Sequence, residues 1–211
     1  MIIREQKLVG KKLKVGHGGT LDPMATGVLV IGVGTGCRAL GSYLSGSKAY
    51  LATGRFGKSF DTLDCTGRLV EEKELPEGLT KESFTSILAS KFTGNIMQRP
   101  PAFSAIHVNG ERAYDLARDG QQVEIPARPV KIDSIRLVSW ELPEFKLEVE
   151  CGGGMYVRSL IADAAVESGS IASMYALERT KQGQFTLDSC ISIEDCKDLE
   201  RIQSVMHQTS N

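Results

Sequence analysis

An aspartate follows a glycine-rich stretch near the start of the chain. The segment Gly16–Gly34 reads GHGGTLDPMATGVLVIGVG, so Asp22 precedes a proline and then a nearly unbroken apolar run. A carboxylate can act as a nucleophile or stabilise a developing positive charge, which makes Asp22 a candidate catalytic residue. An aspartate before proline can also serve only to shape a turn, because the residue before proline avoids the helical region. The segment alone leaves both interpretations open.

Two further segments carry side chains suited to pairing or stacking. In ECGGGMYVRSL, Arg158 falls in the first turn of an expected helix, just after three glycines that let another segment or a ligand approach the backbone closely. An arginine there can pair bidentately with a carboxylate from elsewhere in the chain, for chemistry or for structure alone. In SKAYLATGRFG, Tyr50 falls in an expected strand, where the pattern is also that of a half-buried core tyrosine. In QRPPAFSAIHVNGERAYDLAR, the arginines Arg99, Arg112 and Arg118 are equally consistent with a solvated surface.

Strands and helices are expected to hold these residues. The apolar run GVLVIGVG predicts a buried strand at residues 27–34, and SKAYLATGRFG predicts a second strand. Asn109-Gly110 is a strong hairpin signal and precedes a short helix over Ala113–Arg118. VKIDSIRLVSWELPEFKLEVEC predicts two more strands joined through Pro143.

Two amphipathic helices are predicted as well. In LTKESFTSILASKFTGN, Thr80 can cap the start and Gly94 the end, and one face carries Phe84, Ile87, Leu88 and Phe92. YVRSLIADAAVESG predicts a helix that ends near Gly169, with a core-facing side of Val157, Leu160, Ile161, Ala164 and Ala165. Because the order of elements shows no regular βαβ alternation, we expect an α+β fold with a mixed, largely antiparallel sheet flanked by helices, in a single domain over residues 1–211.

Composition narrows the classes of function. No apolar run reaches the length of a membrane span, and the basic start lacks a secretory signal. The five cysteines are scattered without a C-x-x-C pair, which argues against a disulfide framework and a zinc site and suits a reducing, intracellular compartment. No phosphate-binding loop of the P-loop or dinucleotide type is present. The formal net charge is −1, yet residues 1–21 carry Arg4, Lys7, Lys11, Lys12 and Lys14 against Glu5, a basic edge that can attract phosphates.

Five motifs in register resemble the TruB family of RNA pseudouridine synthases. They are GHGGTLDPMATGVL, SKAYLATGRFGKSFDTLDCTG, FTGNIMQRPPAFSAIHVNGERAYDLARDG, ECGGGMYVRSL and ERTKQGQFTL, and they run from about Lys14 to Leu187. ECGGG and FTGNIMQ resemble the eukaryotic branch more than the bacterial one. The resemblance implies a pseudouridine synthase catalytic domain that isomerises uridine, most notably uridine 55 in the T-loop of tRNA, by flipping the nucleotide out of its stack.

The resemblance also implies roles for individual residues. Asp22 falls on the family's catalytic aspartate, Arg158 on the arginine that pairs with it, and Tyr50 on the tyrosine that stacks on the flipped uracil and is a candidate general base. The residues implied to bind RNA or substrate are His17, which helps to wedge the T-loop open, the basic Arg38, Tyr156, and Leu177, which lines the uracil pocket. Glu178 departs from the arginine that many members carry there.

Further expectations concern partners and the two ends of the chain. No cofactor or metal is expected, because the isomerisation transfers no electron and adds no group. The expected partners are tRNA, bound through its T-arm, and mRNA. The protein is expected to be a monomer and to be located in the cytoplasm, the nucleus or an organelle. Nothing before Lys14 matches the family's lysine-proline-x-glycine-x-threonine-serine strand, and no C-terminal PUA domain is expected. Two alternatives remain: a non-catalytic tRNA-binding or RNA-folding module, and a metabolic enzyme acting on a small substrate.

Overall fold

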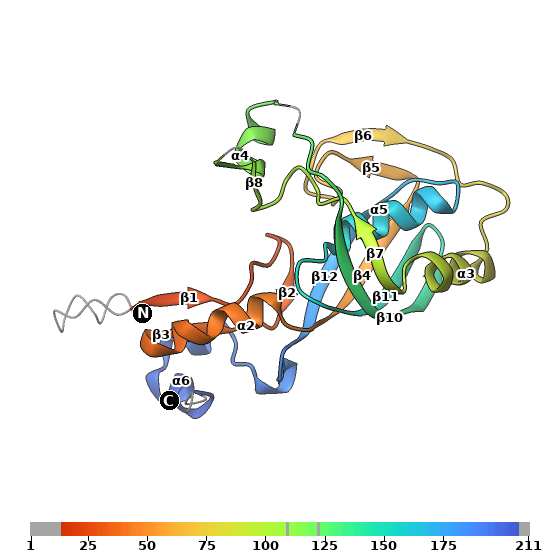
Figure 1. Ribbon diagram of the computed structural model, residues 1–211. Coiled ribbons are helices and arrows are strands. Elements are labelled where there is room, and N and C mark those ends of the chain that lie inside the picture. The colour runs from red at the N-terminus through yellow and green to blue at the C-terminus, as the bar shows by residue number, and fades with distance from the viewer. Residues whose placement is uncertain (1–13, 109, 122, 207–211) are drawn as a thin grey trace.

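The centre of this computed structural model is a sheet of seven strands (Figure 1). The structure describes residues 14–108, 110–121 and 123–206. Six of the strands follow the order β13-β12-β4-β11-β10-β7, and all pairs along this path are antiparallel, whereas β2 pairs parallel with β12. The strands are β2 (Thr26–Gly27), β4 (Lys48–Phe56), β7 (Gly94–Gln98), β10 (Arg128–Glu141), β11 (Glu144–Cys151), β12 (Ala172–Gln182) and β13 (Phe185–Thr186). The expected α+β fold with a mixed, largely antiparallel sheet is therefore confirmed.

Two helices pack on the sheet and enclose the apolar core. α3 (Lys81–Lys91) and α5 (Val157–Glu167) contact β10, β12 and β4 as well as each other. Strand β11 alternates between exposed and buried side chains along its whole length, so its inward face meets these helices. The core includes Phe56, Phe84, Phe145, Leu160 and Ile161, each at most 1% exposed. The ring of Phe56 lies 4.5 Å from that of Phe145 and 5.2 Å from that of Phe84, measured between ring centroids.

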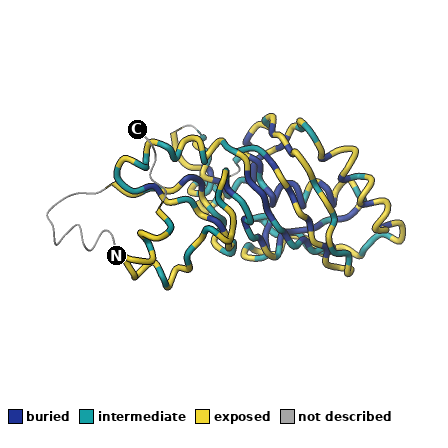
Figure 2. Tube along the Cα trace, turned by 90° about the horizontal axis from the view of Figure 1, so that it is seen from below, coloured by how far each residue is buried: buried dark blue, intermediate teal, exposed yellow. Residues whose placement is uncertain are grey.

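The chain before β4 forms a smaller part of the molecule, which we call the N-terminal lobe (residues 14–47). It contains β1 (Val15–His17), β2, β3 (Ile31–Val33), the 3₁₀ helix η1 (Gly34–Ala39) and α2 (Leu40–Ser45), with β1 and β3 paired antiparallel. Figure 2 shows that buried residues gather in the sheet-and-helix body, whereas the narrower end of the molecule is mostly exposed or intermediate. The lobe therefore has little core of its own.

The remaining elements are short and lie outside the main sheet. Strands β5 (Lys58–Phe60) and β6 (Leu69–Glu72) pair with each other, as do β8 (His107–Val108) and β9 (Glu111–Arg112), which lead into α4 (Ala113–Arg118). The chain ends, within the described residues, in η2 (Leu187–Ser189), η3 (Asp195–Lys197) and α6 (Leu199–Ser204). In Figure 1 the segment with β8 and α4 stands out from the body on one side of the N-terminal lobe.

Most of the predicted elements are confirmed. Helix α3 starts as expected, since the Thr80 hydroxyl accepts a hydrogen bond of 3.1 Å from the Ser83 amide. Helix α5 buries the five core-facing residues that its periodicity predicts. The hairpin of β8 and β9 is present, although Asn109 itself lies outside the described residues. Strands β10 and β11 are joined through Pro143, and the basic residues before Lys14, where the family's first strand was expected to be missing, also lie outside the described part.

The predicted buried strand at residues 27–34 is wrong. The run divides into β2, which joins the main sheet, and β3, which pairs with β1 in the lobe. Val28 is 1% exposed, but Leu29 and Ile31 are 39% and 50% exposed. Gly27 has a φ of +97°, a left-handed conformation that allows the chain to turn away from the sheet. A run of apolar residues does not indicate which strand each of its residues pairs with. The sequence therefore could not show that the two halves of this run join different sheets.

Candidate active site

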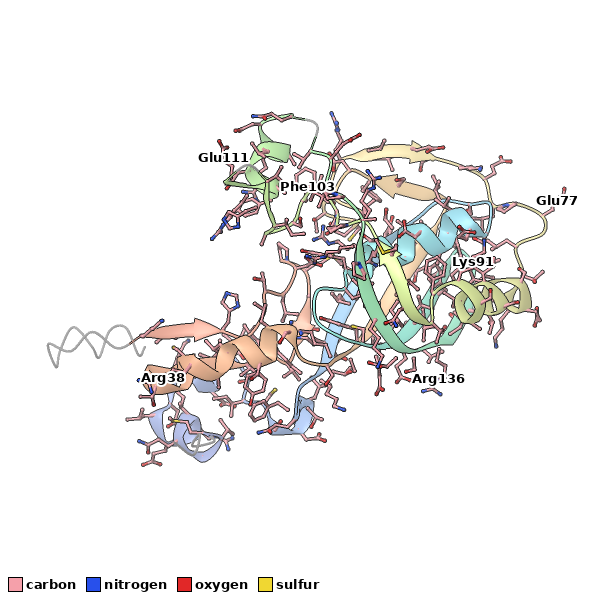
Figure 3. The ribbon with its side chains drawn as sticks, in the orientation of Figure 1. Arg38, Glu77, Lys91, Phe103, Glu111 and Arg136 are labelled. Carbon is pink, nitrogen blue, oxygen red and sulfur yellow. The ribbon has the colours of Figure 1, made fainter. Side chains whose placement is uncertain are left out.

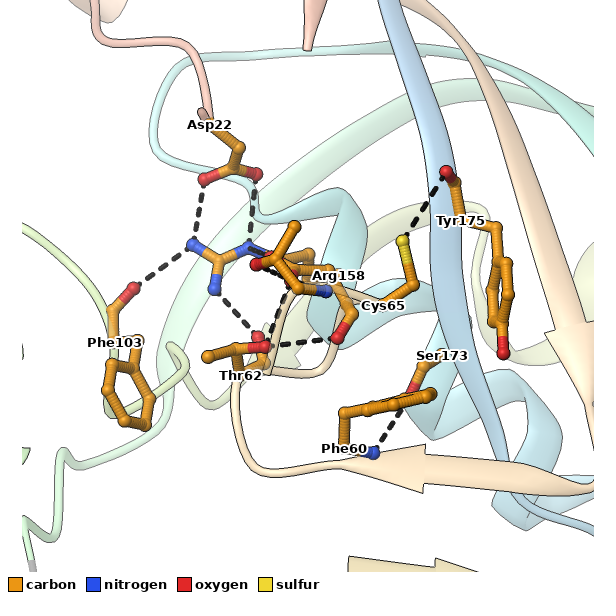
Figure 4. A network of polar contacts seen from close by, with 10 residues as sticks. Asp22, Phe60, Thr62, Cys65, Phe103, Arg158, Ser173 and Tyr175 are labelled. Carbon is orange, nitrogen blue, oxygen red and sulfur yellow. Dashed lines mark hydrogen bonds and ion pairs between the residues drawn. The ribbon is translucent and has the colours of Figure 1, made fainter. Parts of the chain in front are cut away.

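The Asp22 carboxylate and the Arg158 guanidinium meet in a bidentate ion pair (Figure 4). Arg158 Nε donates to Asp22 Oδ2 at 3.0 Å, and Nη2 donates to Oδ1 at 2.8 Å. Asp22 arrives on the loop between β1 and β2, whereas Arg158 is the second residue of α5. The Asp22 side chain is 25% exposed, but that of Arg158 is 6% exposed. The arginine is therefore a fixed support, and the carboxylate is the member of the pair that a substrate can reach.

The loop also satisfies the turn interpretation of Asp22. The Ala25 amide donates to the Asp22 carbonyl oxygen at 2.9 Å, so residues 22–25 form a β-turn with Pro23 in its favoured second position. The backbone of Asp22 makes the turn while its side chain pairs with Arg158. The turn interpretation is therefore confirmed, and the side chain of the same residue forms the ion pair with Arg158; its catalytic role stays a prediction.

A second carboxylate, that of Asp64, also lies beside Arg158. Asp64 Oδ2 lies 3.7 Å from Arg158 Nε, and Asp64 is 3% exposed. Its Oδ1 accepts hydrogen bonds from Thr62 Oγ1, Thr66 Oγ1 and the Thr66 amide at 2.9, 2.5 and 3.0 Å. A buried guanidinium costs free energy unless its donors are matched, and here two carboxylates share it.

Backbone oxygens complete the surroundings of Arg158. Nη1 donates to the Thr62 carbonyl at 2.8 Å, and Nη2 donates to the Phe103 carbonyl at 3.0 Å. Figure 4 shows these groups approaching the guanidinium from separate segments of the chain. Phe103 belongs to the segment that leads into β8 and α4, so Arg158 also ties that segment to the body. The neighbouring Ser104 hydroxyl is buried and makes no hydrogen bond with any described residue.

Tyr50 lies in β4, in the sheet that faces this pair. It is 7% exposed and belongs to the core cluster, so it is more buried than its sequence pattern indicated. Burial raises the pKa of the phenol to about 12; Cys151 and, least, Asp22 add to the rise, whereas the charge and hydrogen bond of Arg179 oppose it. The phenol is therefore neutral at physiological pH. Arg179 of β12 is its partner in the β4–β12 register.

The predicted binding residues fall into two groups. Leu177 of β12 is 6% exposed, two positions before Arg179, and Tyr156 is the residue before α5, two positions before Arg158. The Tyr156 amide donates to Gln98 Oε1 at 2.8 Å, and the Arg128 guanidinium lies 5.6 Å from the Tyr156 ring centroid. Leu177 and Tyr156 thus each lie two positions before a buried arginine, Arg179 and Arg158 respectively.

His17 and Arg38 lie in the N-terminal lobe and are both exposed. His17 ends β1, and its Nδ1 accepts a hydrogen bond of 3.4 Å from the Gly19 amide. Arg38 lies in η1, and Figure 3 shows it at the narrow end of the molecule, far from Phe103. Neither residue contacts the Asp22–Arg158 pair in this structure.

The sequence analysis missed Asp64, Arg179 and Gln182. Asp64 had a signal in SFDTLDCTG, where two aspartates and two threonines cluster beside an expected strand. Arg179 and Gln182 are 1% and 0% exposed in β12, but the sequence ERTKQ resembles a solvated strand end. Their burial depends on the lobe that covers them, which local sequence does not reveal.

Comparison with known proteins assigns the chain to a family. Residues 6–157 match the family described as TruB family pseudouridylate synthase (N terminal domain). This chain belongs to the TruB family. The human Pseudouridylate synthase TRUB1 is 51% identical to it over 200 residues, which are 94% of this chain and 57% of the relative. The tRNA pseudouridine synthase B of Parabacteroides distasonis is 40% identical over 198 residues, covering 92% of this chain and 81% of the relative.

The fold agrees with that of solved structures. The chain is similar to one in the crystal structure of a Cbf5-Nop10-Gar1 complex, with a TM-score of 0.67, 25% identity, and coverage of 96% of this chain and 50% of that chain. This TruB family chain therefore spans about 57% of its human relative and about half of the structural neighbour. Among the described residues no helix is long and apolar enough to span a membrane.

Proposed function

We propose that this chain isomerises uridine to pseudouridine in RNA, with uridine 55 of the tRNA T-loop as its main target. Membership of the TruB family supports the reaction class, and curated relatives carry the names pseudouridylate synthase and tRNA pseudouridine synthase. The observation that carries the proposal is the partly exposed Asp22 carboxylate, which the buried Arg158 orients through two hydrogen bonds.

The reaction breaks the bond between ribose C1′ and uracil N1 and forms a bond from C1′ to C5. The C5 hydrogen leaves as a proton, and N1 gains a proton, so no electron or external group is exchanged. Asp22 either attacks the nucleotide or stabilises positive charge on the sugar as the first bond breaks. Arg158 holds the carboxylate in one orientation throughout, because its own position is fixed by Asp64, Thr62 and Phe103.

Tyr50 and Leu177 would form the floor on which the flipped uracil rests. The phenol is neutral at physiological pH, so Tyr50 offers an aromatic face and a hydroxyl that can donate a hydrogen bond. To act as the candidate general base, the phenol would first have to lose its proton, which its raised pKa opposes. Tyr156, His17 and Arg38 would contact the RNA around the flipped base. The exposure of His17 and Arg38 supports this role, because RNA contacts require solvent-facing side chains.

The partner would be tRNA, bound through its T-arm, and mRNA would be a further substrate. Because its RNA substrates occur within cells, we place the protein inside the cell, as a monomer with one catalytic domain. No cofactor is required by the balance of the reaction.

The decisive experiment measures tritium release from tRNA labelled at uracil C5. Each new C1′–C5 bond expels that hydrogen to water, so the signal reports the chemical step. We expect release by the parent chain, loss of at least about a thousandfold in rate for Asp22→Asn, and an unchanged rate for Asp133→Asn, which removes an exposed carboxylate paired with Lys131.

Mapping the modified position in the same tRNA tests the choice of uridine 55. Pseudouridine elsewhere would retain the reaction but contradict the target. Salt-sensitive tRNA binding without tritium release from the parent would favour the alternative of a non-catalytic RNA-binding module.

A further inference from the structure

The loop that carries Asp22 has few apolar contacts with the body of the protein. Of the lobe residues that the structure describes, Val28 alone has a fully buried apolar side chain, and Met24 and Ala25 pack partly against the core. The tube in Figure 2 shows the same contrast between a buried body and an exposed narrow end. The position of the loop must therefore depend on polar contacts.

Arg179 makes the first set of these contacts from β12, between β4 and β2. It is 1% exposed, and its Nε donates to the Val28 carbonyl at 2.7 Å. Its Nη2 and Nη1 donate to the carbonyls of Gly19 and Thr20 at 3.2 and 3.5 Å. The fork of a single guanidinium thus holds the loop before and after Asp22, which a point charge such as lysine cannot do.

Gln182, three residues after Arg179 in β12, makes the second set of contacts. Its Nε2 donates to the Gly18 carbonyl at 2.6 Å, and its Oε1 accepts from the Val30 amide at 3.1 Å. The Gly18 amide also donates to the Val30 carbonyl at 2.8 Å, which closes the base of the loop. Residue 182 must supply both a donor and an acceptor, and among side chains of this length an amide does so without charge.

We propose that Arg179 and Gln182 are positioning residues that set Asp22 against Arg158. Asp22 and its arginine come from different elements, so their alignment depends on where the base of the loop lies relative to α5. Arg179 is also the register partner of Tyr50, so the same side chain fixes the loop beside the strand that carries the phenol. The inference rests on the proposed function, because it assigns these residues to the catalytic competence of Asp22.

This role differs from general support of the fold. Strand β12 is held by β4 along the register from Ala172–Phe56 to Gln182–Lys48. The side-chain contacts of Arg179 and Gln182 with the Asp22 loop, which we call the clamp, instead join that strand to a loop with little apolar burial. Loosening the clamp should therefore impair the chemical step more than it lowers stability.

The test compares Arg179→Lys and Gln182→Leu with the parent in the full chain. Single-turnover tritium release measures the chemical step, filter binding measures the tRNA dissociation constant, and thermal melting measures the folded fraction. We expect the single-turnover rate to fall about a hundredfold for Arg179→Lys while the dissociation constant changes by less than about threefold. The control Arg136→Lys alters an exposed arginine of β10 paired with Glu148 and should retain the parent rate.

A second measurement does not depend on activity. The Val30 amide bonds to Gln182 Oε1, so Gln182→Leu should speed its hydrogen exchange, while amides in the β4–β11 pairs keep the parent rate. Parental single-turnover rates per folded molecule in both variants would overturn the inference, as would Val30 exchange that does not change. If the parent itself makes no pseudouridine, the proposed function fails and the positioning role fails with it, whereas loss confined to the variants leaves the proposed function intact.

Discussion

Buried polar residues hold the Asp22 carboxylate in place. Arg158 and Asp64 are 5% and 3% exposed, and each finds its partners inside the protein. Removing the arginine would leave Asp64 as a buried carboxylate without its cation, which typically costs about 3–5 kcal/mol. Asp22, at the edge of the network, is the member whose side chain is partly exposed to solvent.

At the same scale, Tyr50 makes the stability of the folded protein decrease as the pH rises through the alkaline range. Its pKa rises from 10.0 to about 12 on folding, so the folded state favours the neutral phenol. The resulting stabilisation is fully present below pH 10 and is lost as the pH rises toward about 12. A pKa rise from 10.0 to about 12 corresponds to roughly 3 kcal/mol of folding free energy.

Urea unfolding of the parent and Tyr50→Phe across this pH range tests the expectation. The free energy of unfolding should decline more steeply in the parent, because phenylalanine has no proton to lose. Parallel curves for the two proteins would contradict the pKa shift.

At the scale of elements, β12 organises the site. It pairs with β4, which carries Tyr50, and its own Arg179 and Gln182 bind the backbone of the Asp22 loop. The glycines before α5 contribute as well. A Cβ on Gly153 would lie 2.6 Å from the Ser45 backbone, so that glycine allows α2 to approach the start of the arginine helix.

Gly27 tests how β2 positions the loop. A Cβ there would lie 2.3 Å from the Arg179 carbonyl oxygen, and φ is +97°. We expect Gly27→Ala to destabilise the protein by about 2 kcal/mol, because both strain and overlap must be relieved. It should also lower tritium release per folded molecule, since β2 begins four residues after Asp22 and anchors the end of its turn to β12.

The matched control is Gly36→Ala in η1, where a Cβ would meet nothing within 4 Å. Urea midpoints and release rates of the two variants give the comparison. Equal behaviour would show that the close pairing of β2 with β12 has no bearing on the site.

At the scale of the whole molecule, charge is distributed unevenly. The formal net charge is −1, so the protein has no overall attraction for RNA. The proposed RNA binding would rely on local groups of basic residues, and residues 1–21 hold five against one acidic residue. The affinity of a protein for RNA through such groups falls as salt displaces it from the phosphates.

We expect tRNA affinity to fall roughly tenfold or more between about 50 and 200 mM salt. Replacing Lys11 and Lys12 with glutamine should lower the slope of log K against log salt by about one to two. Filter binding at several salt concentrations measures both quantities, with Arg136→Gln as the surface control. A slope near zero in the parent would contradict RNA binding through phosphates.

The sequence by itself determined the local elements and the family motifs. Thr80 caps α3, side chains of β11 alternate between exposed and buried, and α5 buries its predicted face. Capping and hydrophobic periodicity predict these features because both depend on residues close together in the chain. The candidate set of Asp22, Tyr50 and Arg158 also came from the sequence, through its resemblance to the TruB family. The pairing of Asp22 with Arg158 agrees with that resemblance, although the catalytic roles remain to be tested.

The tertiary structure decided which polar residues became buried partners. Asp22 and Arg158 lie 136 positions apart, and Gly19 and Arg179 lie 160 apart. The structure also divided the apolar run at residues 27–34 between two sheets and placed Arg179 and Gln182 beneath the lobe. Such burial depends on strand order and on which segment covers a strand, and both are set by contacts between residues far apart in the chain, which no local pattern encodes.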